Sequence, residues 1–195
     1  MLTIFFFSLL FAAQQPLLGP LDGEGFAPTE VARIKVGMVA PDFRLKDEHG
    51  MIHQLSDYRG KKDIVLVFYR GNWCGQCAAQ FGELKDLLDD NAKLKTQILG
   101  VSPDDNDGGR KMVERVTKES GGPPGFPLLA DPEFKVIHRY GVFNPDLFNG
   151  HKVPYPSVFV LDRSGKVTWK YLDSEKQTRP GNAAILKALA ELDNK

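Results

Sequence analysis

The two cysteines of this chain lie three positions apart in the segment Trp73-Cys74-Gly75-Gln76-Cys77. The segment follows an apolar run at 64–69 and precedes a stretch in which apolar residues recur at helical spacing. A cysteine in the first turn of a helix has a lowered pKa, because free N–H groups and the positive end of the helix dipole stabilise the thiolate. A second thiol one turn away can then close a disulfide. The arrangement predicts a redox-active dithiol.

Two other interpretations of the cysteine pair fit its surroundings less well. Free cysteines are common in protein cores, but this pair is flanked by Trp and Gly at a strand-to-helix junction. A structural zinc site needs four ligands, usually including a second Cys-x-x-Cys or a paired histidine motif. The four histidines are scattered, and His49 and His53 straddle a predicted turn at Gly50. We therefore expect no metal and no other cofactor, with the dithiol itself as the redox centre.

Length and charge restrict the function further. A chain of 195 residues is long enough for one domain with a substantial core, so the disulfide is not needed for folding. The 25 basic residues balance the 25 acidic ones, and no basic stripe with interleaved aromatics is present. Nucleic acid and anionic membrane surfaces are therefore poor candidates as partners.

The N-terminal segment suggests export. Residues 1–13 form an apolar run of the length of a signal-peptide core, too short for a standard membrane span. No Lys or Arg precedes the run, and Ala12 and Ala13 make no clean cleavage signal, so an uncleaved N-terminal anchor stays an alternative. Residues 14–35 are rich in Pro and Gly and are predicted to be a linker, which leaves 36–195 as the domain. We expect an exported protein in a periplasmic or other extracytoplasmic compartment.

Hydrophobic periodicity predicts an α/β domain. Alternating apolar positions over 40–55 indicate a hairpin, and four-residue turn chemistry at 162–165 indicates a second one. Asp131 and Pro132 are typical of a helix start, with Asp as the cap and Pro in the first position. The expected strands are 64–69, 97–102, 126–130, 157–161 and 166–171, and the expected helices are 75–92, 110–119, 131–140 and 182–192. This order predicts a central mixed sheet with helices on both faces.

A proline close to the fourth expected strand supplies the second part of the candidate site. Pro156 follows Pro154 and Tyr155 and abuts the strand at 157–161. A cis peptide bond before such a proline is usually kept for its geometry, although trans is the rule for an ordinary turn. Because Pro156 accompanies the cysteine motif, we expect a cis bond that shapes a groove opposite the dithiol.

Several segments together resemble the thioredoxin-fold redoxin group, specifically the peroxiredoxin-like AhpC/TSA branch. The similar segments are 36–43, 55–61, 68–77, 156–165 and Arg179-Pro180. The resemblance implies a thioredoxin-like fold, with a central mixed sheet flanked by helices and an N-terminal β-hairpin extension. It also implies antioxidant or cell redox functions that depend on a redox-active centre and a thiol reductant.

The active-site segment departs from the peroxiredoxin pattern Pro-x-x-x-Thr-x-x-Cys. Arg70 stands at the proline position, Cys74 at the threonine position and Cys77 at the peroxidatic position, while the groove arginine of that family falls on Pro156. Trp73-Cys74-Gly75-x-Cys77 with Pro156 is instead similar to thioredoxins, in which the first cysteine attacks. The buried acid of thioredoxins has no counterpart at Phe68.

Three functions follow from this mixture. The first is a thiol–disulfide oxidoreductase in which Cys74 attacks a protein disulfide and Cys77 releases the product. The second is an atypical two-cysteine peroxidase with Cys77 peroxidatic and Cys74 resolving, in which Arg70 or Arg179 supports the thiolate. The third, a binding domain with a structural disulfide, is disfavoured because so short a loop constrains the unfolded chain little. The residues expected to line the substrate groove are Tyr69, Arg70, Trp73, Gly75, Gln76 and Pro156.

Overall fold

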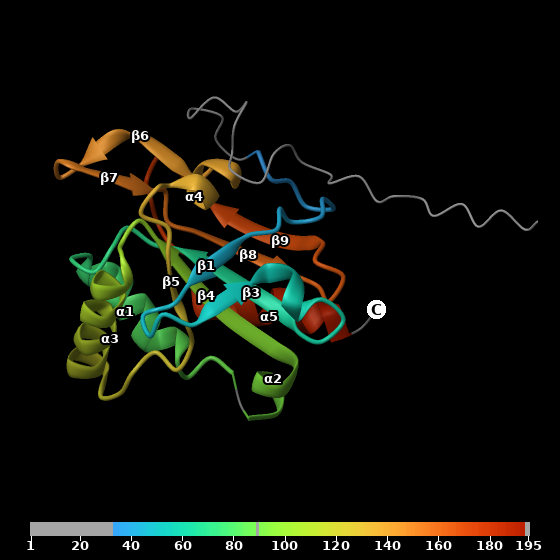
Figure 1. Ribbon diagram of the computed structural model, residues 1–195. Coiled ribbons are helices and arrows are strands. Elements are labelled where there is room, and N and C mark those ends of the chain that lie inside the picture. The colour runs from blue at the N-terminus through green and yellow to red at the C-terminus, as the bar shows by residue number, and fades with distance from the viewer. Residues whose placement is uncertain (1–32, 89, 194–195) are drawn as a thin grey trace, which may run out of the picture.

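The computed structural model describes residues 33–88 and 90–193 (Figure 1). Within these residues seven strands form one sheet in the order β2-β1-β5-β4-β3-β8-β9. The strands are β1 (Arg44–Lys46), β2 (Ile52–Gln54), β3 (Asp63–Phe68), β4 (Thr96–Ser102), β5 (Leu128–Ala130), β8 (Ser157–Leu161) and β9 (Val167–Leu172). Residues 1–32, which hold the predicted signal-like run and most of the predicted linker, lie outside the described residues.

β3 lies inside the sheet, between β4 and β8, as its continuous apolar sequence predicts. All six of its residues are buried, which is typical of a strand covered on both faces. It pairs parallel with β4 and antiparallel with β8, and the β8 register sets Phe68 opposite Ser157. The two ladders bring the end of β3 and the start of β8 together, and the active-site segment begins at that point.

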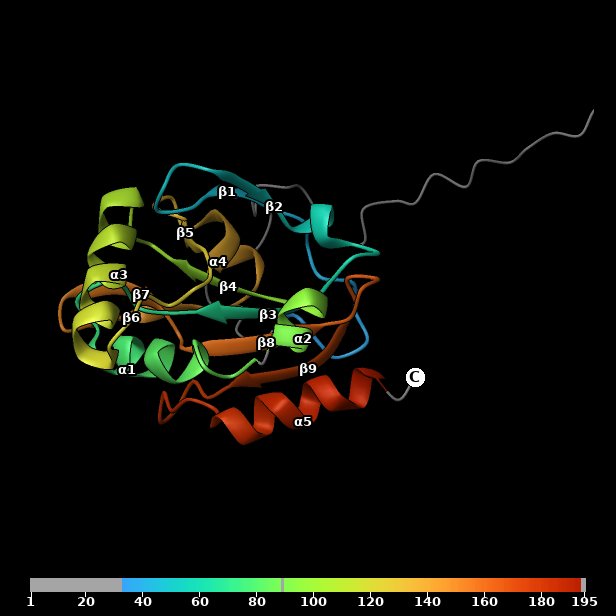
Figure 2. The same ribbon diagram turned by 90° about the horizontal axis from the view of Figure 1, so that it is seen from below.

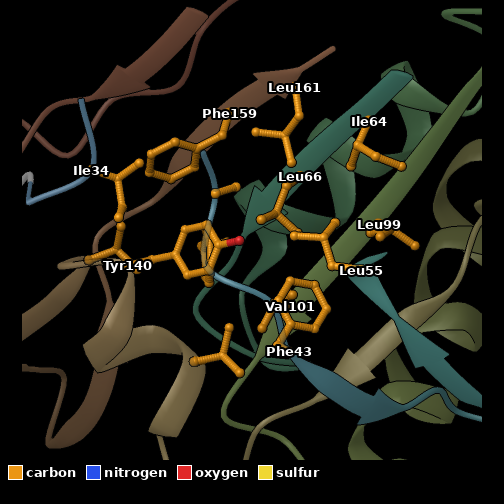
Figure 3. Close-up of a cluster of buried hydrophobic side chains, with 14 of the residues drawn as sticks. Ile34, Phe43, Leu55, Ile64, Leu66, Leu99, Val101, Tyr140, Phe159 and Leu161 are labelled. Atoms are coloured by element: carbon orange, nitrogen blue, oxygen red, sulfur yellow. The ribbon is translucent and has the colours of Figure 1, made fainter. Parts of the chain in front are cut away.

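Helices cover the two faces of the sheet unequally (Figure 2). The helices α1 (Gly75–Leu84), α3 (Asn106–Ser120) and α5 (Asn182–Asp193) bury their apolar sides against one face, in a cluster that includes Val65, Val67 and both cysteines. The short helix α4 (Lys135–Arg139) and the 3-10 turn η1 (Leu55–Tyr58) cover the other face. Tyr140 lies at the centre of that second cluster and donates a 2.8 Å hydrogen bond from its hydroxyl to the Pro41 carbonyl (Figure 3). The fold is therefore the expected α/β sandwich of helices around a mixed sheet.

The two predicted hairpins are present, and a third one was missed. β1 pairs with β2, and β8 pairs with β9, both antiparallel. Strands β6 (Phe143–Phe148) and β7 (His151–Pro154) form a separate two-stranded sheet where no strand was expected. Asn149 and Gly150 make its turn with positive φ angles of 52° and 81°. Pro145 inside β6 weakens the strand signal in the sequence.

The predicted helix at 75–92 is wrong in its length. α1 ends at Leu84, and after a turn a separate short helix, α2 (Asp90–Lys95), follows. The Lys85 ammonium donates to the Ser120 carbonyl at 2.5 Å and holds the turn against the end of α3. Leu87 and Leu88 are still buried from the turn, whereas Leu94 is 74% exposed. Apolar spacing at these positions is satisfied equally by a helix and by a turn, so the sequence did not distinguish them.

Two smaller expectations also need correction. Asp131 is not the N-cap of α4 and Pro132 is not its first residue, because the helix begins at Lys135 with Phe134, at a φ of 59°, as its N-cap. The Asp131 Oδ2 nevertheless accepts the N–H of Ile137 in that helix at 2.9 Å. The Tyr155–Pro156 peptide bond is trans, since the described residues contain no cis bond. Pro156 lies between β7 and β8, and its trans peptide bond fits the connection between them. No helix in the described part of the chain is long and apolar enough to cross a lipid bilayer.

Candidate active site

The end of β3 and the start of α1 present the two cysteines. Cys74 is the N-cap residue of α1, and its Sγ accepts the N–H of Cys77 at 3.2 Å. The two residues form a disulfide, with their Cα atoms 5.2 Å apart. Cys74 keeps 4% of its surface exposed, whereas Cys77 has none. Cys74 is therefore the half of the disulfide that a second molecule can reach.

Side chains of α3 and of the segment before it hold the loop between β3 and α1 by hydrogen bonds. Arg115 donates from Nη1 to the carbonyl of Trp73 at 2.9 Å and to that of Asn72 at 3.3 Å. The Asn72 amide donates to Asp104 Oδ1 at 3.1 Å, and burial raises the pKa of that carboxyl. Gly71 has a φ of 141°, and a Cβ there would lie 3.0 Å from the indole nitrogen of Trp73. The loop therefore needs glycine at this position.

Arg179 brings a positive charge to the sulfur atoms. Its Nη2 lies 3.1 Å from Cys77 Sγ and 3.4 Å from Cys74 Sγ, and its Nη1 donates to Gln76 Oε1 at 3.0 Å. Burial, with a smaller contribution from the neighbouring Arg70, lowers the pKa of Arg179 to about 10. The guanidinium is therefore charged at neutral pH and is placed to stabilise a thiolate on either cysteine.

A second guanidinium lies beside the first. Arg70 is 5% exposed, donates from Nη2 to Gln177 Oε1 at 2.5 Å, and lies with its guanidinium carbon 3.6 Å from the centre of the Phe148 ring. Burial lowers the pKa of Arg70. Among the described residues, no carboxylate forms an ion pair with Arg70 or with Arg179.

The β6–β7 hairpin makes an aromatic wall over the loop. The Trp73 indole stacks on His151 with ring centres 4.8 Å apart and on Phe148 with ring centres 6.1 Å apart. The hairpin lies at the end of the sheet where α1 begins, in both ribbon views. Phe148 thus contacts the site from one strand and His151 from the other.

The remaining residues that the sequence placed in the groove have different positions. Tyr69 is 1% exposed and packs edge-on against Phe81, so it supports the loop from the core and does not line a groove. Gly75 leaves room for Arg115, whose Nη2 would be 3.3 Å from an added Cβ. Pro156 is buried directly before Ser157, beside the end of β3, and Gln76 is exposed next to Arg179.

Sequence reasoning did not identify three residues that hold the site together. Gln177, Arg115 and Asp104 reach it from segments that are 32 to 107 positions away from their partners. Nothing in their local sequence signals these contacts. Within 33–88 and 90–193, no group of three or more His, Cys, Asp or Glu residues is placed to hold a metal ion.

Comparison with known proteins places this arrangement in a family. The AhpC/TSA family matches residues 36–170. A thiol-disulfide oxidoreductase ResA of Geobacillus thermodenitrificans is 35% identical over 140 residues, which cover 71% of this chain and 70% of that protein. A peroxiredoxin Bcp of Bacillus subtilis is 34% identical over 136 residues, covering 69% of this chain and 82% of the relative.

Solved structures agree on the fold. A peroxidoxin BcpB from Mycobacterium tuberculosis superposes with a TM-score of 0.66 and 26% identity, covering 83% of this chain and 98% of that one. A variant of peroxiredoxin 6 from Arenicola marina gives a TM-score of 0.72 at 22% identity, covering 82% and 74%. The fold is thioredoxin-like, as the sequence predicted.

Proposed function

This chain belongs to the AhpC/TSA family and is an oxidoreductase with a Cys-x-x-Cys pair, and we propose that it catalyses thiol–disulfide exchange with Cys74 as the attacking residue. One observation carries the proposal: Cys74 is the more accessible cysteine, with 4% of its surface exposed against none for Cys77, and its Sγ accepts an N–H at the first turn of α1. That position stabilises a thiolate through the helix N-terminus. A relative named thiol-disulfide oxidoreductase supports the same chemistry.

The two cysteines alone carry out the bond changes on the substrate. The Cys74 thiolate attacks one sulfur of a substrate disulfide, forms a mixed disulfide and releases the other substrate sulfur as a thiolate. The Cys77 thiolate then attacks Cys74 Sγ, which closes the Cys74–Cys77 disulfide and releases the second substrate thiolate. The substrate gains two electrons and the protein loses two, so an external thiol reductant must restore the dithiol. The opposite direction uses the same steps in reverse.

The surrounding residues have separate roles in this proposal. Arg179 stabilises the thiolates from 3.1 and 3.4 Å, and Gln76 orients it. Trp73 and Pro156 form walls of the substrate groove beside Arg70. Gly75 keeps the first turn of α1 open to Arg115, and Tyr69 supports the loop from beneath.

Single cysteine variants test the order of attack. We expect Cys74→Ser to abolish exchange, and we expect Cys77→Ser to accumulate mixed disulfides that mass spectrometry detects as substrate adducts on Cys74. Adducts on Cys77 in the Cys74→Ser variant, with none on Cys74 in the other, would reverse the two roles.

One distance favours a second candidate function. Arg179 Nη2 lies closer to Cys77 than to Cys74, and Cys77 stands at the peroxidatic position of peroxiredoxins. In this scheme the Cys77 thiolate attacks a peroxide oxygen and becomes a sulfenic acid, releasing water or an alcohol. The Cys74 thiol then displaces water and closes the disulfide. A peroxiredoxin among the relatives supports this alternative.

Mixing reduced protein separately with hydrogen peroxide and with a protein disulfide distinguishes the two functions. Trp73 packs over the loop of the cysteines, so its fluorescence is expected to report their oxidation. Fast exchange with the disulfide and slow reaction with peroxide are expected. Fast oxidation by peroxide alone, abolished in Cys77→Ser, would establish the peroxidase.

The cellular setting is also a proposal. The apolar run at 1–13 supports export to an extracytoplasmic compartment, where the domain at 36–195 meets disulfides and a thiol reductant. Detection of a protein that begins after the run, in the extracytoplasmic fraction, would support export with cleavage. Its retention on membranes would support an uncleaved anchor.

A further inference from the structure

We propose that Arg70 and Arg179 form a subsite for a carboxylate of the substrate, so that the protein prefers low-molecular-mass disulfides with a carboxylate close to a sulfur atom. The inference rests on the proposed thiol–disulfide activity and adds a substrate class to it. It starts from the pair of guanidinium groups beside the disulfide.

The guanidinium groups of Arg70 and Arg179 have no carboxylate partner among the described residues. Arg70 and Arg179 contact the neutral amide oxygens of Gln177 and Gln76, and neither forms an ion pair in the described part of the chain. Asp173 and Glu175 precede Arg179 in the chain, but the Asp173 carboxylate binds Thr178 and the N–H of Lys176. Two adjacent guanidinium groups without a carboxylate favour an external anion.

Neighbouring side chains hold both guanidinium groups in place. Arg70 is 5% exposed and is fixed between Gln177 and the Phe148 ring. The Nε atoms of both arginines are buried without a hydrogen-bond acceptor. A guanidinium presents several donors in a planar fork that matches a carboxylate, so two fixed forks make a preorganised anion site.

A carboxylate close to the reacting sulfur of a substrate can reach these guanidinium groups. Arg179 touches both sulfur atoms of the pair, so a substrate sulfur bonded to Cys74 lies next to the same guanidinium. In cystine and in dithiodipropionate only two carbons separate the sulfur from the carboxylate carbon. A carboxylate so close to the reacting sulfur falls within range of Arg179 or of its neighbour Arg70. The backbone of a protein disulfide carries no such carboxylate, except at a C-terminal cysteine.

Rates with two small disulfides of opposite character test the subsite. Reduced protein is mixed with dithiodipropionate, which is anionic, or with hydroxyethyl disulfide, which is neutral, and Trp fluorescence is followed at low salt. Each rate is divided by that of dithiothreitol with the same disulfide, which corrects for intrinsic reactivity. We expect roughly a 10-fold preference for the anionic disulfide, the size of a charge-assisted hydrogen bond.

Variants locate the preference. Arg70→Gln should reduce the preference several-fold, and Arg70→Lys, which keeps the charge and loses the fork, should give an intermediate value. Lys166→Gln is the matched control, because it removes one exposed positive charge from the β8–β9 turn at the opposite end of β8. If Arg70→Gln does not fold, the comparison of Arg70→Lys with Lys166→Gln still locates the preference, because only Arg70→Lys alters the guanidinium fork.

The outcomes separate this inference from the function on which it rests. Equal normalised rates of the wild-type protein with both disulfides would overturn the subsite while leaving the exchange activity intact. An equal loss of preference in Arg70→Gln and Lys166→Gln would also overturn it, because the effect would then come from net charge. Failure of both disulfides to oxidise the protein, together with fast oxidation by peroxide, would instead overturn the proposed function.

Discussion

The two sulfur atoms experience different surroundings although they belong to one short motif. Cys74 Sγ accepts an N–H of the first helical turn, and both sulfurs lie within 3.4 Å of the same guanidinium nitrogen. Cys77 is fully buried, so its thiolate would be stabilised mainly by Arg179. A single cation therefore serves the attack of one thiol and the departure of the other.

Replacing Arg179 should shift the ionisation of the reactive thiol. A nearby cation lowers a thiol pKa, so in Arg179→Gln the midpoint of Cys74 alkylation against pH should rise by about 1 pH unit. Arg179→Lys should recover part of the shift. The measurement is the rate of iodoacetamide modification of reduced Cys77→Ser protein, with and without each substitution. An unchanged midpoint would remove Arg179 from thiolate stabilisation.

The sequence predicted the cysteine pair and the arginine beside it, but not the residues that hold the loop in place. Cys74, Cys77 and Trp73 form a local motif whose spacing carries its chemistry, so they could be read without a structure. Gln177 contacts Arg70 across 107 positions and Arg115 contacts the Trp73 carbonyl across 42, and such contacts depend on how the distant segments pack. Tyr69 directly follows β3, and the sequence alone does not show that Phe81 of α1 covers its ring.

At the scale of elements, the site lies where the loop after β3 of the main sheet contacts the β6–β7 hairpin. The hairpin contacts the cysteine loop through two rings stacked on Trp73 and through the Phe148 ring, over which the Arg70 guanidinium lies. These are aromatic contacts of modest individual strength. The hairpin is therefore held over the site without being part of its hydrogen-bonded sheet.

Phe148→Ala should loosen the hairpin. The substitution removes one stacking partner of Trp73 and the ring beneath Arg70, so backbone amides of β6 and β7 should exchange with deuterium roughly 10-fold faster. Leu147→Ala is the matched control, because Leu147 is 61% exposed on the same strand. Equal exchange in the two variants would show that the aromatic contacts do not hold the hairpin.

The start of α3 is set by Asp105, whose Oδ1 accepts the N–H of Gly108 at 2.8 Å. Asp105→Ala removes this cap and should reduce the free energy of unfolding by about 1 kcal/mol. For a chain of this size the thermal midpoint should then fall by about 2–4 °C. Glu114→Ala, at an exposed position of the same helix, is the control and should change the midpoint less.

The elements that the sequence predicted best are those with one strong signal. Buried apolar runs identified β3 and β4, and turn chemistry identified the β8–β9 hairpin. α2 was missed because Leu87 and Leu88 can be buried from a turn as well as from a helix. α3 was expected only from Arg110, although Asp105 as a cap already predicts the earlier start.

At the scale of the whole molecule, a buried acid ties β5 to α4. Asp131 is 2% exposed, directly follows β5, and accepts the N–H of Ile137 in α4. Burial raises the pKa of Asp131 from 3.8 to about 7, against the opposing effect of the backbone N–H groups. Between about pH 4 and pH 7, folding therefore favours the protonated form of the Asp131 carboxyl.

Stability should fall with rising pH through the titration of Asp131. Because the folded pKa exceeds the unfolded value, the stabilising contribution is complete below about pH 4 and is lost as the pH rises through about 7. The difference in unfolding free energy between Asp131→Asn and wild type should change by on the order of 4 kcal/mol over that range, in favour of Asn at high pH. Urea unfolding at several pH values measures it.

A matched variant isolates this effect. Asp86→Asn removes a carboxylate that is 79% exposed and serves as the control for a change in net charge. A parallel pH dependence of wild type and Asp131→Asn would contradict the raised pKa.

The separation of the β6–β7 sheet from the seven-stranded sheet has a consequence for divergence. Insertions, deletions and substitutions in 145–152, which is exposed or half-buried, leave the register of β3 with β4 and β8 untouched, so they spare the core that presents the cysteines. The hairpin is therefore the part of the molecule in which selection can alter the choice of substrate at little expense in folding. Homologues with the same dithiol are expected to vary most there in length and in aromatic content.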